Sequence, residues 1–419
     1  MHVSLVGLNH STTPVTIREK VAISAQKLRD SLLLLRCYVT HGIILSTCNR
    51  TEVYTMSSHH AEAASIDFLN ATTGVSFADL LPHIYLRENE AAFEHLFRVA
   101  SGLDSMIVGE FEVLGQVRQA LAVAEKARMV NLPLRYIFQS AIRTGRRVRD
   151  ETGISKNAVS ISSVAVDLAA NILGDLGNCK VLVIGAGEAS RLVVKIAKER
   201  GASPIVIASR TQERASALAA TLGGIPIKLN NLVEELSTAN IVVTCSGAPR
   251  WILDVRHLEE VMQKRPRLPL VIIDIAVPRD VEPAVGQIKN VFLHNIDDLT
   301  EVSGLNHQQR EGEIQKAREI IAAEVSKLVT WWRAIEARPI VSDLMRNAEE
   351  IRCAQLKKTL RKLPQLSDEE RNSLEAMTRS IVTKILKKPI EHLKTNADNN
   401  RGYAETVSEL FQLNRKKRK

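Results

Sequence analysis

The sequence predicts three consecutive domains of different fold class: an α+β domain, an α/β domain built on a parallel sheet, and an all-α domain, over residues 1–155, 156–305 and 306–419. Up to about residue 151, strand-like runs are mixed with amphipathic helical stretches. From Asn178 to Asn295, apolar runs alternate with helical stretches, as in βαβ units. After Asn306 the strand signals stop and apolar residues recur every seven positions. A chain of 419 residues with 45% apolar content can bury cores of this size.

The N-terminal domain is predicted to contain three strands. Val3 to Gly7 and Ile43 to Ser46 are short apolar runs, as expected of buried strands. Thr51 to Met56 alternates polar and apolar residues, which is typical of a strand. Amphipathic helical stretches follow, so this domain should be α+β.

The middle domain is predicted to be a parallel sheet with helical connections. Its apolar runs have the spacing of βαβ units, in which the strands are buried on both faces. The five runs are Lys180 to Ile184, Ile205 to Ala208, Ile241 to Thr244, Val271 to Asp274 and Val291 to Leu293.

The C-terminal domain carries an apolar seam along a long helix. Its members recur every seven residues, which places them on one side of the helix. They are Ile314, Ile321, Leu328 and Ile335. We expect Pro339 to interrupt this helix. Beyond the proline, the step resumes at Leu344 and Ile351.

A last helix is predicted after Ser367, which forms a capping box with Glu370. Its apolar positions are Leu374, Met377, Ile381 and Ile385. So small a helical segment needs a partner surface for its seam, and a second copy of the chain can provide it. We therefore expect a homodimer; an intramolecular helical bundle is the alternative.

Charge and cysteine content limit the class of protein. Lys and Arg total 56 against 47 Asp and Glu, and the net charge of +9 favours a polyanionic partner. Five cysteines lie far apart without a C-x-x-C pair, which argues against disulfides and a zinc site and favours a reducing cytoplasm. No charged leader precedes an apolar segment, and no run of about 18 uncharged apolar residues occurs. We expect a soluble, cytoplasmic protein without membrane contact or a bound metal.

Two basic clusters are candidate contacts for phosphates. One is Arg143 to Arg149, in a helical pattern, and the other is the chain end, Arg415 to Lys419. A solvated helix face and a disordered tail are the alternatives.

A glycine-rich loop follows the first predicted strand of the middle domain. Its first glycine allows a tight turn, its second lets a pyrophosphate approach the backbone, and the next helix offers N–H groups to the phosphates. This predicts a Rossmann-type dinucleotide site, although Ser190 replaces the third fingerprint glycine. A glycine turn required only for close packing is the alternative. The loop is Gly185, Ala186, Gly187, Glu188, Ala189 and Ser190.

The end of the next strand predicts the choice of nicotinamide cofactor. An acidic residue there would bind the ribose hydroxyls of NAD. The sequence instead has Ser209, Arg210 and Thr211. Arg210 can pair with a 2′-phosphate and its neighbours supply hydroxyl groups, so NADPH is expected.

Cys48 is the candidate nucleophile, flanked by hydroxyl, amide and guanidinium groups. A nearby cation such as Arg50 favours the reactive thiolate. A small buried hydrophobic side chain is the alternative role of such a cysteine. A thiol and a hydride donor together suggest that an acyl group is held as a thioester and reduced to an aldehyde. The basic chain suggests that this group arrives on a phosphate or a nucleic acid.

Five segments resemble the glutamyl-tRNA reductase family, and the resemblance extends from the N-terminus to about Leu299. It implies reduction of glutamyl-tRNA by NADPH to glutamate-1-semialdehyde, the first committed step of tetrapyrrole synthesis from glutamate by way of 5-aminolevulinate. It also implies a V-shaped homodimer joined through the C-terminal helices. The segments are Gly7 to His10, Ser46 to Glu52, His95 to Ser105, Leu114 to Val117 and Asp274 to Val281.

The resemblance also implies roles for individual residues. Cys48 is the nucleophile that displaces tRNA, and His95 assists proton transfer to the ribose oxygen; a structural histidine is the alternative for His95. Arg50 would pair with the substrate carboxylate. This is a second role for Arg50, beside favouring the thiolate of Cys48. The other implied pocket residues are Thr47, Asn49, Ser105, Glu110, Phe111, Glu112 and Gln116.

The chain departs from the family pattern at Phe111 and Glu112, where Pro and Gln are common. An extra carboxylate would repel an anionic substrate unless it faces the amino group or solvent. Two other functions compete: an NADP-dependent dehydrogenase of a small polar acid, resembling shikimate dehydrogenases, and a non-catalytic tRNA-binding protein. Because the aldehyde product is unstable, contact with glutamate-1-semialdehyde aminotransferase is plausible.

Overall fold

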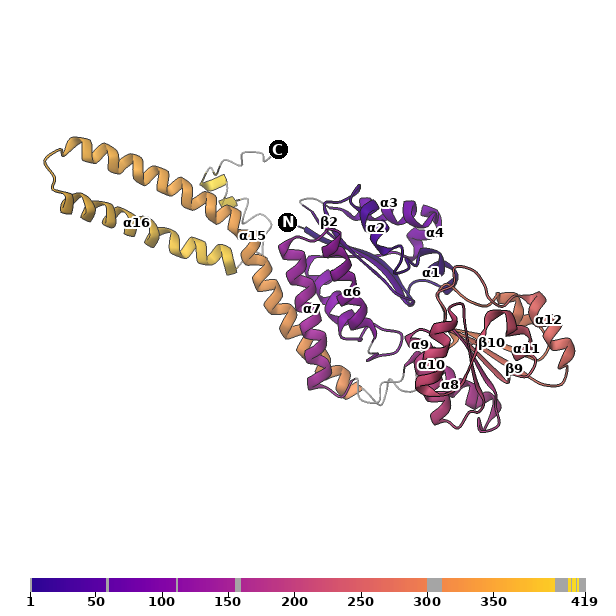
Figure 1. Cartoon of the computed structure of the whole chain (residues 1–419). Coiled ribbons are helices and arrows are strands. Elements are labelled where there is room, and N and C mark those ends of the chain that lie inside the picture. Colours follow the sequence, from indigo (N-terminus) through magenta and orange to yellow (C-terminus); the bar gives the residue numbers. More distant parts are fainter. Residues whose placement is uncertain are drawn as a thin grey trace. The chain divides into compact units, whose positions relative to one another are not determined.

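The computed structural model of the chain (Figure 1) describes residues 2–57, 60–110, 112–154, 160–299, 311–395, 406–407, 409–411 and 413. The chain divides into two compact units, Met1–Ala322 and Ala323–Lys419. The first unit contains two sheets and the second contains long helices.

The N-terminal sheet has four strands in the order β2-β3-β1-β4, and all neighbours are antiparallel. The three predicted strands are present. The fourth strand, β4, was not predicted because its side chains are mostly exposed and carry no apolar run. The strands are β1 (His2–Asn9), β2 (His41–Ser46), β3 (Arg50–Ser57) and β4 (Tyr85–Glu88).

In the part of the chain that the structure describes, seven α-helices accompany this sheet. Helix α5 packs on β1 and α7, and α6 packs on β2 and α7. Helix α7 begins where the Asn131 side chain accepts the Leu134 N–H, an N-cap that satisfies a free backbone donor. The helices are α1 (Val15–Val21), α2 (Leu28–Leu35), α3 (Glu62–Thr73), α4 (Phe77–Leu80), α5 (Asn89–Ala100), α6 (Glu112–Lys126) and α7 (Leu132–Glu151).

The second sheet is parallel throughout and has the order β10-β9-β8-β5-β6-β7. This is the Rossmann order, whose switch point lies between β5 and β8. All five predicted strands are present, and the edge strand β7 was missed because it is short and contains Pro226. The strands are β5 (Val181–Ile184), β6 (Ile205–Ser209), β7 (Ile225–Lys228), β8 (Ile241–Thr244), β9 (Leu270–Asp274) and β10 (Val291–Asn295).

Helices cover both faces of the parallel sheet (Figure 1). Val181 and Val183 of β5 face a core that includes α8, α9 and α10, whereas Leu182 and Ile184 face a core that includes α11 and α12. A strand buried on both faces explains the continuous apolar runs in the sequence. The helices are α8 (Ile161–Leu173), α9 (Glu188–Glu199), α10 (Gln212–Leu222), α11 (Leu232–Leu236) and α12 (Val255–Lys264).

Two long helices follow, α15 (Glu311–Lys362) and α16 (Asp368–Thr395). The expectation that Pro339 interrupts the first helix was wrong, since α15 continues through it. Proline removes one N–H donor, a cost of about 3 kcal/mol that a helix of 52 residues can absorb. The predicted capping box is confirmed: Ser367 N–H donates to Glu370 at 2.8 Å, and Glu370 N–H donates to Ser367 Oγ at 3.3 Å.

The helical unit buries only part of its apolar seam. Leu344 of α15 and Leu386 of α16 share one buried cluster. Several predicted seam residues are instead exposed, so the described part of this unit does not cover them: Ile351, Met377, Ile381 and Ile385. Within the described residues, no helix combines the length and hydrophobicity that a bilayer crossing requires.

Candidate active site

Cys48 lies on the tight connection between β2 and β3. The connection is held by Thr47, whose Oγ1 accepts the backbone N–H groups of Asn49 at 3.1 Å and Arg50 at 3.2 Å. The Asn49 carbonyl accepts the His10 N–H at 2.9 Å. A side-chain oxygen that bonds nearby backbone donors favours a turn, so the local sequence itself places the thiol at the sheet edge.

The thiol of Cys48 is half-buried among apolar side chains, Val15, Met106 and Ile296. Burial raises its pKa to about 12, and the nearby carboxylates of Glu110 and Glu112 act in the same direction. The substrate-free protein therefore holds Cys48 as a neutral thiol at pH 7. A cation must stabilise the thiolate when it reacts.

The guanidinium of Arg18 lowers the pKa of Cys48 and so opposes burial and the two carboxylates. Its guanidinium donates to the Cys48 carbonyl at 3.2 Å and to Asn49 Oδ1 at 3.3 Å, and it pairs with Asp297. Sequence reasoning missed Arg18 because it lies on α1, about 30 residues from the thiol, in a stretch with no local motif.

Arg50, the neighbour that the sequence suggested as activator, is engaged elsewhere. It is buried, and its Nη1 pairs with Glu52 at 2.7 Å and with Asp104 at 3.1 Å. Its Nη2 also donates to the Asp104 carbonyl. The structure thus places Arg50 in a buried ion-pair network behind the Cys48 turn.

Glu52 is the centre of that network and was given no role from the sequence. Its Oε1 accepts from His95 Nε2 at 2.8 Å, from Tyr85 at 2.7 Å and from Arg50, and its Oε2 accepts from Tyr54 at 2.7 Å. Burial opposes ionisation, but His95 and Arg50 hold the pKa of Glu52 well below its ordinary value. His95 is therefore oriented by a buried carboxylate.

The remaining predicted pocket residues lie on the segment that leads into α6 or, for Glu112 and Gln116, on α6 itself. Ser105 is buried, and Glu110 is half-buried. Burial raises the pKa of Glu110, Ser105 opposes this rise, and Glu112 adds to it. Gln116 lies half-buried on α6, and Phe111 lies outside the described residues.

His10 is a further residue of this region to which the sequence assigned no role. Its Nδ1 is buried and has no hydrogen-bond partner within the described residues. Burial lowers the pKa of His10 to about 4, and the cations Arg50 and Arg18 contribute. The imidazole is therefore neutral at pH 7.

The glycine-rich loop connects β5 to α9, as predicted. Gly185 has φ of +131°, and a Cβ there would lie 2.7 Å from the Cys245 carbonyl oxygen, so only glycine fits. A Cβ at Gly187 would meet open space, which leaves the backbone accessible to a phosphate. Ser190, at the third fingerprint position, is buried, and its Oγ accepts the Gly187 N–H at 3.2 Å. The Ser190 hydroxyl thus forms a hydrogen bond within the loop, where a glycine would have no side chain.

Ser209, Arg210 and Thr211 lie where β6 ends and α10 begins. The Thr211 N–H donates to Ser209 Oγ at 3.3 Å. Arg210 is exposed and makes no hydrogen bond or ion pair within the part of the chain that the structure describes. Its guanidinium is available to an anionic ligand.

The two predicted sites lie in the same compact unit and are linked. Arg279, which follows β9, donates to Glu19 of α1 at 2.7 and 2.9 Å, a two-bond pairing that fixes orientation. Burial raises the pKa of Glu112, and the nearby carboxylate of Glu188 in the glycine loop raises it further. The fold thus brings the nucleotide-binding sheet toward the Cys48 turn.

Three family models match the chain. They are described as glutamyl-tRNAGlu reductase, N-terminal domain, over residues 6–152; shikimate / quinate 5-dehydrogenase, over 167–302; and glutamyl-tRNAGlu reductase, dimerisation domain, over 316–413. The glutamyl-tRNA reductase of Moorella thermoacetica is 40% identical, over 99% of this chain and 95% of the relative. That of Natranaerobius thermophilus is 37% identical, over 99% and 92%. The solved glutamyl-tRNA reductase from Methanopyrus kandleri is 33% identical with a TM-score of 0.50, over 98% of this chain and 99% of that chain.

Proposed function

The chain belongs to the glutamyl-tRNA reductase family of oxidoreductases, and on this basis we propose that it reduces glutamyl-tRNA to glutamate-1-semialdehyde through a thioester at Cys48. The observation that carries the proposal is the position of this thiol. It stands on a tight turn at the sheet edge, beside Arg18 and in range of Glu110 and Glu112. The product would enter tetrapyrrole synthesis.

The first step is acyl transfer. The sulfur of Cys48 attacks the ester carbonyl carbon, a C–S bond forms, and the bond from that carbon to the ribose oxygen breaks. The proton lost from the thiol ends on the ribose oxygen. NADPH, when bound, would supply the hydride that reduces the thioester to an aldehyde; Cys48 would leave as the thiolate and then take up a proton from water.

The protein's own residues control the charge of the sulfur. Burial keeps the thiol protonated until substrate arrives, which protects it from other electrophiles. Arg18 then stabilises the thiolate from its position on α1, where it donates to the Cys48 carbonyl. His95 remains our proposed proton-transfer group, and Glu52 fixes its ring.

Recognition of the glutamyl group is assigned to residues of the Cys48 turn, of the segment that leads into α6 and of α6 itself. Arg50 would bind the substrate carboxylate by exchanging it for Asp104, the half-buried member of its network. The other proposed contacts are Thr47, Asn49, Ser105, Glu110, Phe111, Glu112 and Gln116.

NADPH is the proposed cofactor. The chain fits this group, because Gly187 leaves open space before the N-terminus of α9 and Arg210 is exposed at the end of β6, without a partner among the described residues. The loop residues Gly185, Ala186, Gly187, Glu188, Ala189 and Ser190 would hold the diphosphate. Ser209, Arg210 and Thr211 would hold the 2′-phosphate.

Replacing Arg210 with alanine is expected to raise the KM for NADPH by roughly tenfold or more, because a charged hydrogen bond contributes about 1.5–3 kcal/mol. The KM for NADH should stay nearly unchanged. Steady-state kinetics with both cofactors measure this, and Arg214→Ala, an exposed arginine on α10, is the matched control. Equal losses with both cofactors would argue against the 2′-phosphate contact.

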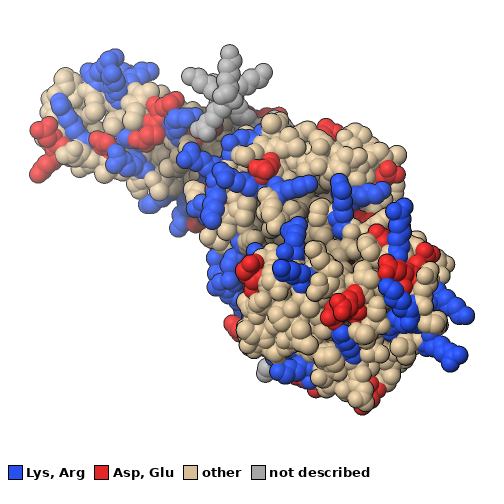
Figure 2. All heavy atoms as spheres, turned by 45° about the vertical axis from the view of Figure 1, so that its right-hand side comes forward, with Lys and Arg blue, Asp and Glu red and all other residues tan. Residues whose placement is uncertain are grey.

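The proposed partners follow from charge and exposed apolar surface. Basic side chains are more prominent than acidic ones on the face that Figure 2 shows, which suits tRNA. The dimerisation-domain match and the exposed Met377, Ile381 and Ile385 support a homodimer. We also propose a cytoplasmic location, where a thiol stays reduced, and transfer of the aldehyde to glutamate-1-semialdehyde aminotransferase.

The proposed function is tested by following NADPH oxidation by the purified full-length chain. Glutamyl-tRNA should support oxidation, whereas uncharged tRNA and free glutamate should not. Oxidation with a small acid in the absence of tRNA would instead support a dehydrogenase of the shikimate type. Binding of tRNA without any oxidation would support the non-catalytic alternative.

A further inference from the structure

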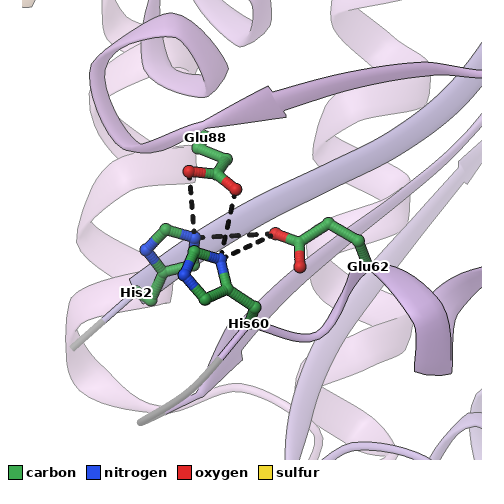
Figure 3. Close-up of side chains that lie close together, drawn as sticks. All are labelled: His2, His60, Glu62 and Glu88. Atoms are coloured by element: carbon green, nitrogen blue, oxygen red, sulfur yellow. Dashed lines mark hydrogen bonds and ion pairs between the residues drawn. The ribbon is translucent and has the colours of Figure 1, made fainter.

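We propose that His2, His60, Glu62 and Glu88 form a binding site for a divalent transition-metal ion of the zinc class. Figure 3 shows the four side chains converging on one point. Two imidazoles and two carboxylates are a donor set that zinc accepts. The site lies outside the proposed reaction chemistry and does not depend on it.

The histidine nitrogens lie at distances from the carboxylate oxygens that are close to those around a tetrahedral ion. His2 Nε2 lies 3.6 Å from Glu62 Oε1 and 3.5 Å from Glu88 Oε2, and His60 Nδ1 lies 3.6 Å from Glu62 Oε1 and 3.2 Å from Glu88 Oε1. Zinc bonds of about 2.0–2.1 Å require donor atoms roughly 3.3–3.4 Å apart at tetrahedral angles. All four donor atoms lie within 4.8 Å of one another.

A second, independent observation is the state of His2. This residue is only 7% exposed, and its Nε2 is buried without a hydrogen-bond partner within the described residues. The same atom points at both carboxylates. A buried nitrogen that faces two carboxylates at 3.5–3.6 Å without forming a hydrogen bond to either is costly, and a metal ion between these groups would remove that cost.

The ligands come from separate elements of the N-terminal domain. His2 begins β1, Glu62 begins α3, and Glu88 ends β4. In the β1–β3 register, His2 is seven residues from the end that carries Asn9, so the site lies roughly 23 Å along the sheet from the Cys48 turn. We expected no metal because the spacing of the cysteines does not match a metal-binding motif. The spacing of His2, His60, Glu62 and Glu88 in the sequence does not match one either.

The surrounding hydrogen bonds make a further prediction. Ser4 Oγ donates to Glu62, which orients that carboxylate. Asn89 Oδ1 accepts the Val3 N–H at 3.0 Å, and its Nδ2 faces His2 Nδ1 at 3.2 Å. Metal at Nε2 requires a proton on Nδ1, so Asn89 must turn its oxygen toward His2. Asn89→Asp supplies acceptors to both groups and should tighten binding by about tenfold or more.

The test is zinc binding by the untagged full-length chain, measured by calorimetry and equilibrium dialysis in a Cys48→Ser background that removes a competing thiol. One equivalent should bind, and His60→Ala and Glu88→Gln should each weaken it by at least about tenfold. Cobalt should give the strong visible absorption of a tetrahedral site. His257→Ala, an exposed histidine on α12, is the matched control and should leave the stoichiometry and affinity unchanged.

The outcomes are distinct. Loss of the site in the His60 and Glu88 variants, with a gain in Asn89→Asp, supports the proposal. Binding that is unchanged in both loss variants, or an Asn89→Asp chain that binds no more tightly than its parent, overturns it. Since His60 and Glu88 are exposed, their replacement should leave folding intact, and circular dichroism checks this.

Discussion

Glu52→Gln is expected to lower the stability of the N-terminal sheet by about 3–5 kcal/mol, because it leaves the buried Arg50 charge without its main partner. The glutamine side chain would also offer only one acceptor oxygen to the donors of His95, Tyr85 and Tyr54, whereas the carboxylate offers two. Hydrogen exchange of the β1 and β3 amides reports on this region directly. Protection there should fall by about 100-fold or more.

The control is Glu94→Gln, which removes an exposed carboxylate from α5 and should leave protection unchanged. The effect should also depend on pH. Because the folded-state pKa of Glu52 is lowered, its contribution is present above the unfolded pKa of about 4.3 and declines as pH falls below it. A difference between the two proteins that grows below about pH 4 would contradict this account.

Cys48→Ser is expected to reduce the rate of glutamyl-tRNA reduction by roughly 1000-fold or more, because a hydroxyl is a far weaker nucleophile than a thiolate. NADPH affinity should be unchanged, since the glycine loop belongs to a different sheet. Single-turnover kinetics with saturating substrate measure the loss. Cys37→Ser, which changes an exposed thiol of the same unit, should keep full activity.

Element prediction succeeded where hydrophobic periodicity is strong. All five apolar runs of the middle domain are strands, because burial on both faces requires apolar residues throughout. Strands β4 and β7 were missed because edge strands with exposed side chains lack that pattern. The continuation of α15 through Pro339 was missed because the local penalty of proline is smaller than the support from a long helix.

The site could be predicted only where neighbours in sequence are neighbours in space. The turn that holds Cys48 and the glycine loop are local features, so both could be read directly. Arg18 reaches the Cys48 backbone from helix α1, and Glu52 joins donors from β3, β4 and α5. Only the fold brings these groups together, whereas the pairing of Arg50 with Glu52, two residues apart on β3, follows from the alternation of side chains along a strand.

The most direct measurement is capture of the acyl-enzyme. The full-length chain is mixed with glutamyl-tRNA carrying a labelled glutamyl group, without NADPH, and is then denatured, digested and mapped. The account predicts label on the peptide that contains Cys48, released by added NADPH before denaturation and absent from Cys48→Ser. Equal label on wild type and Cys48→Ser, or no label on either while reduction proceeds, would contradict a covalent thioester.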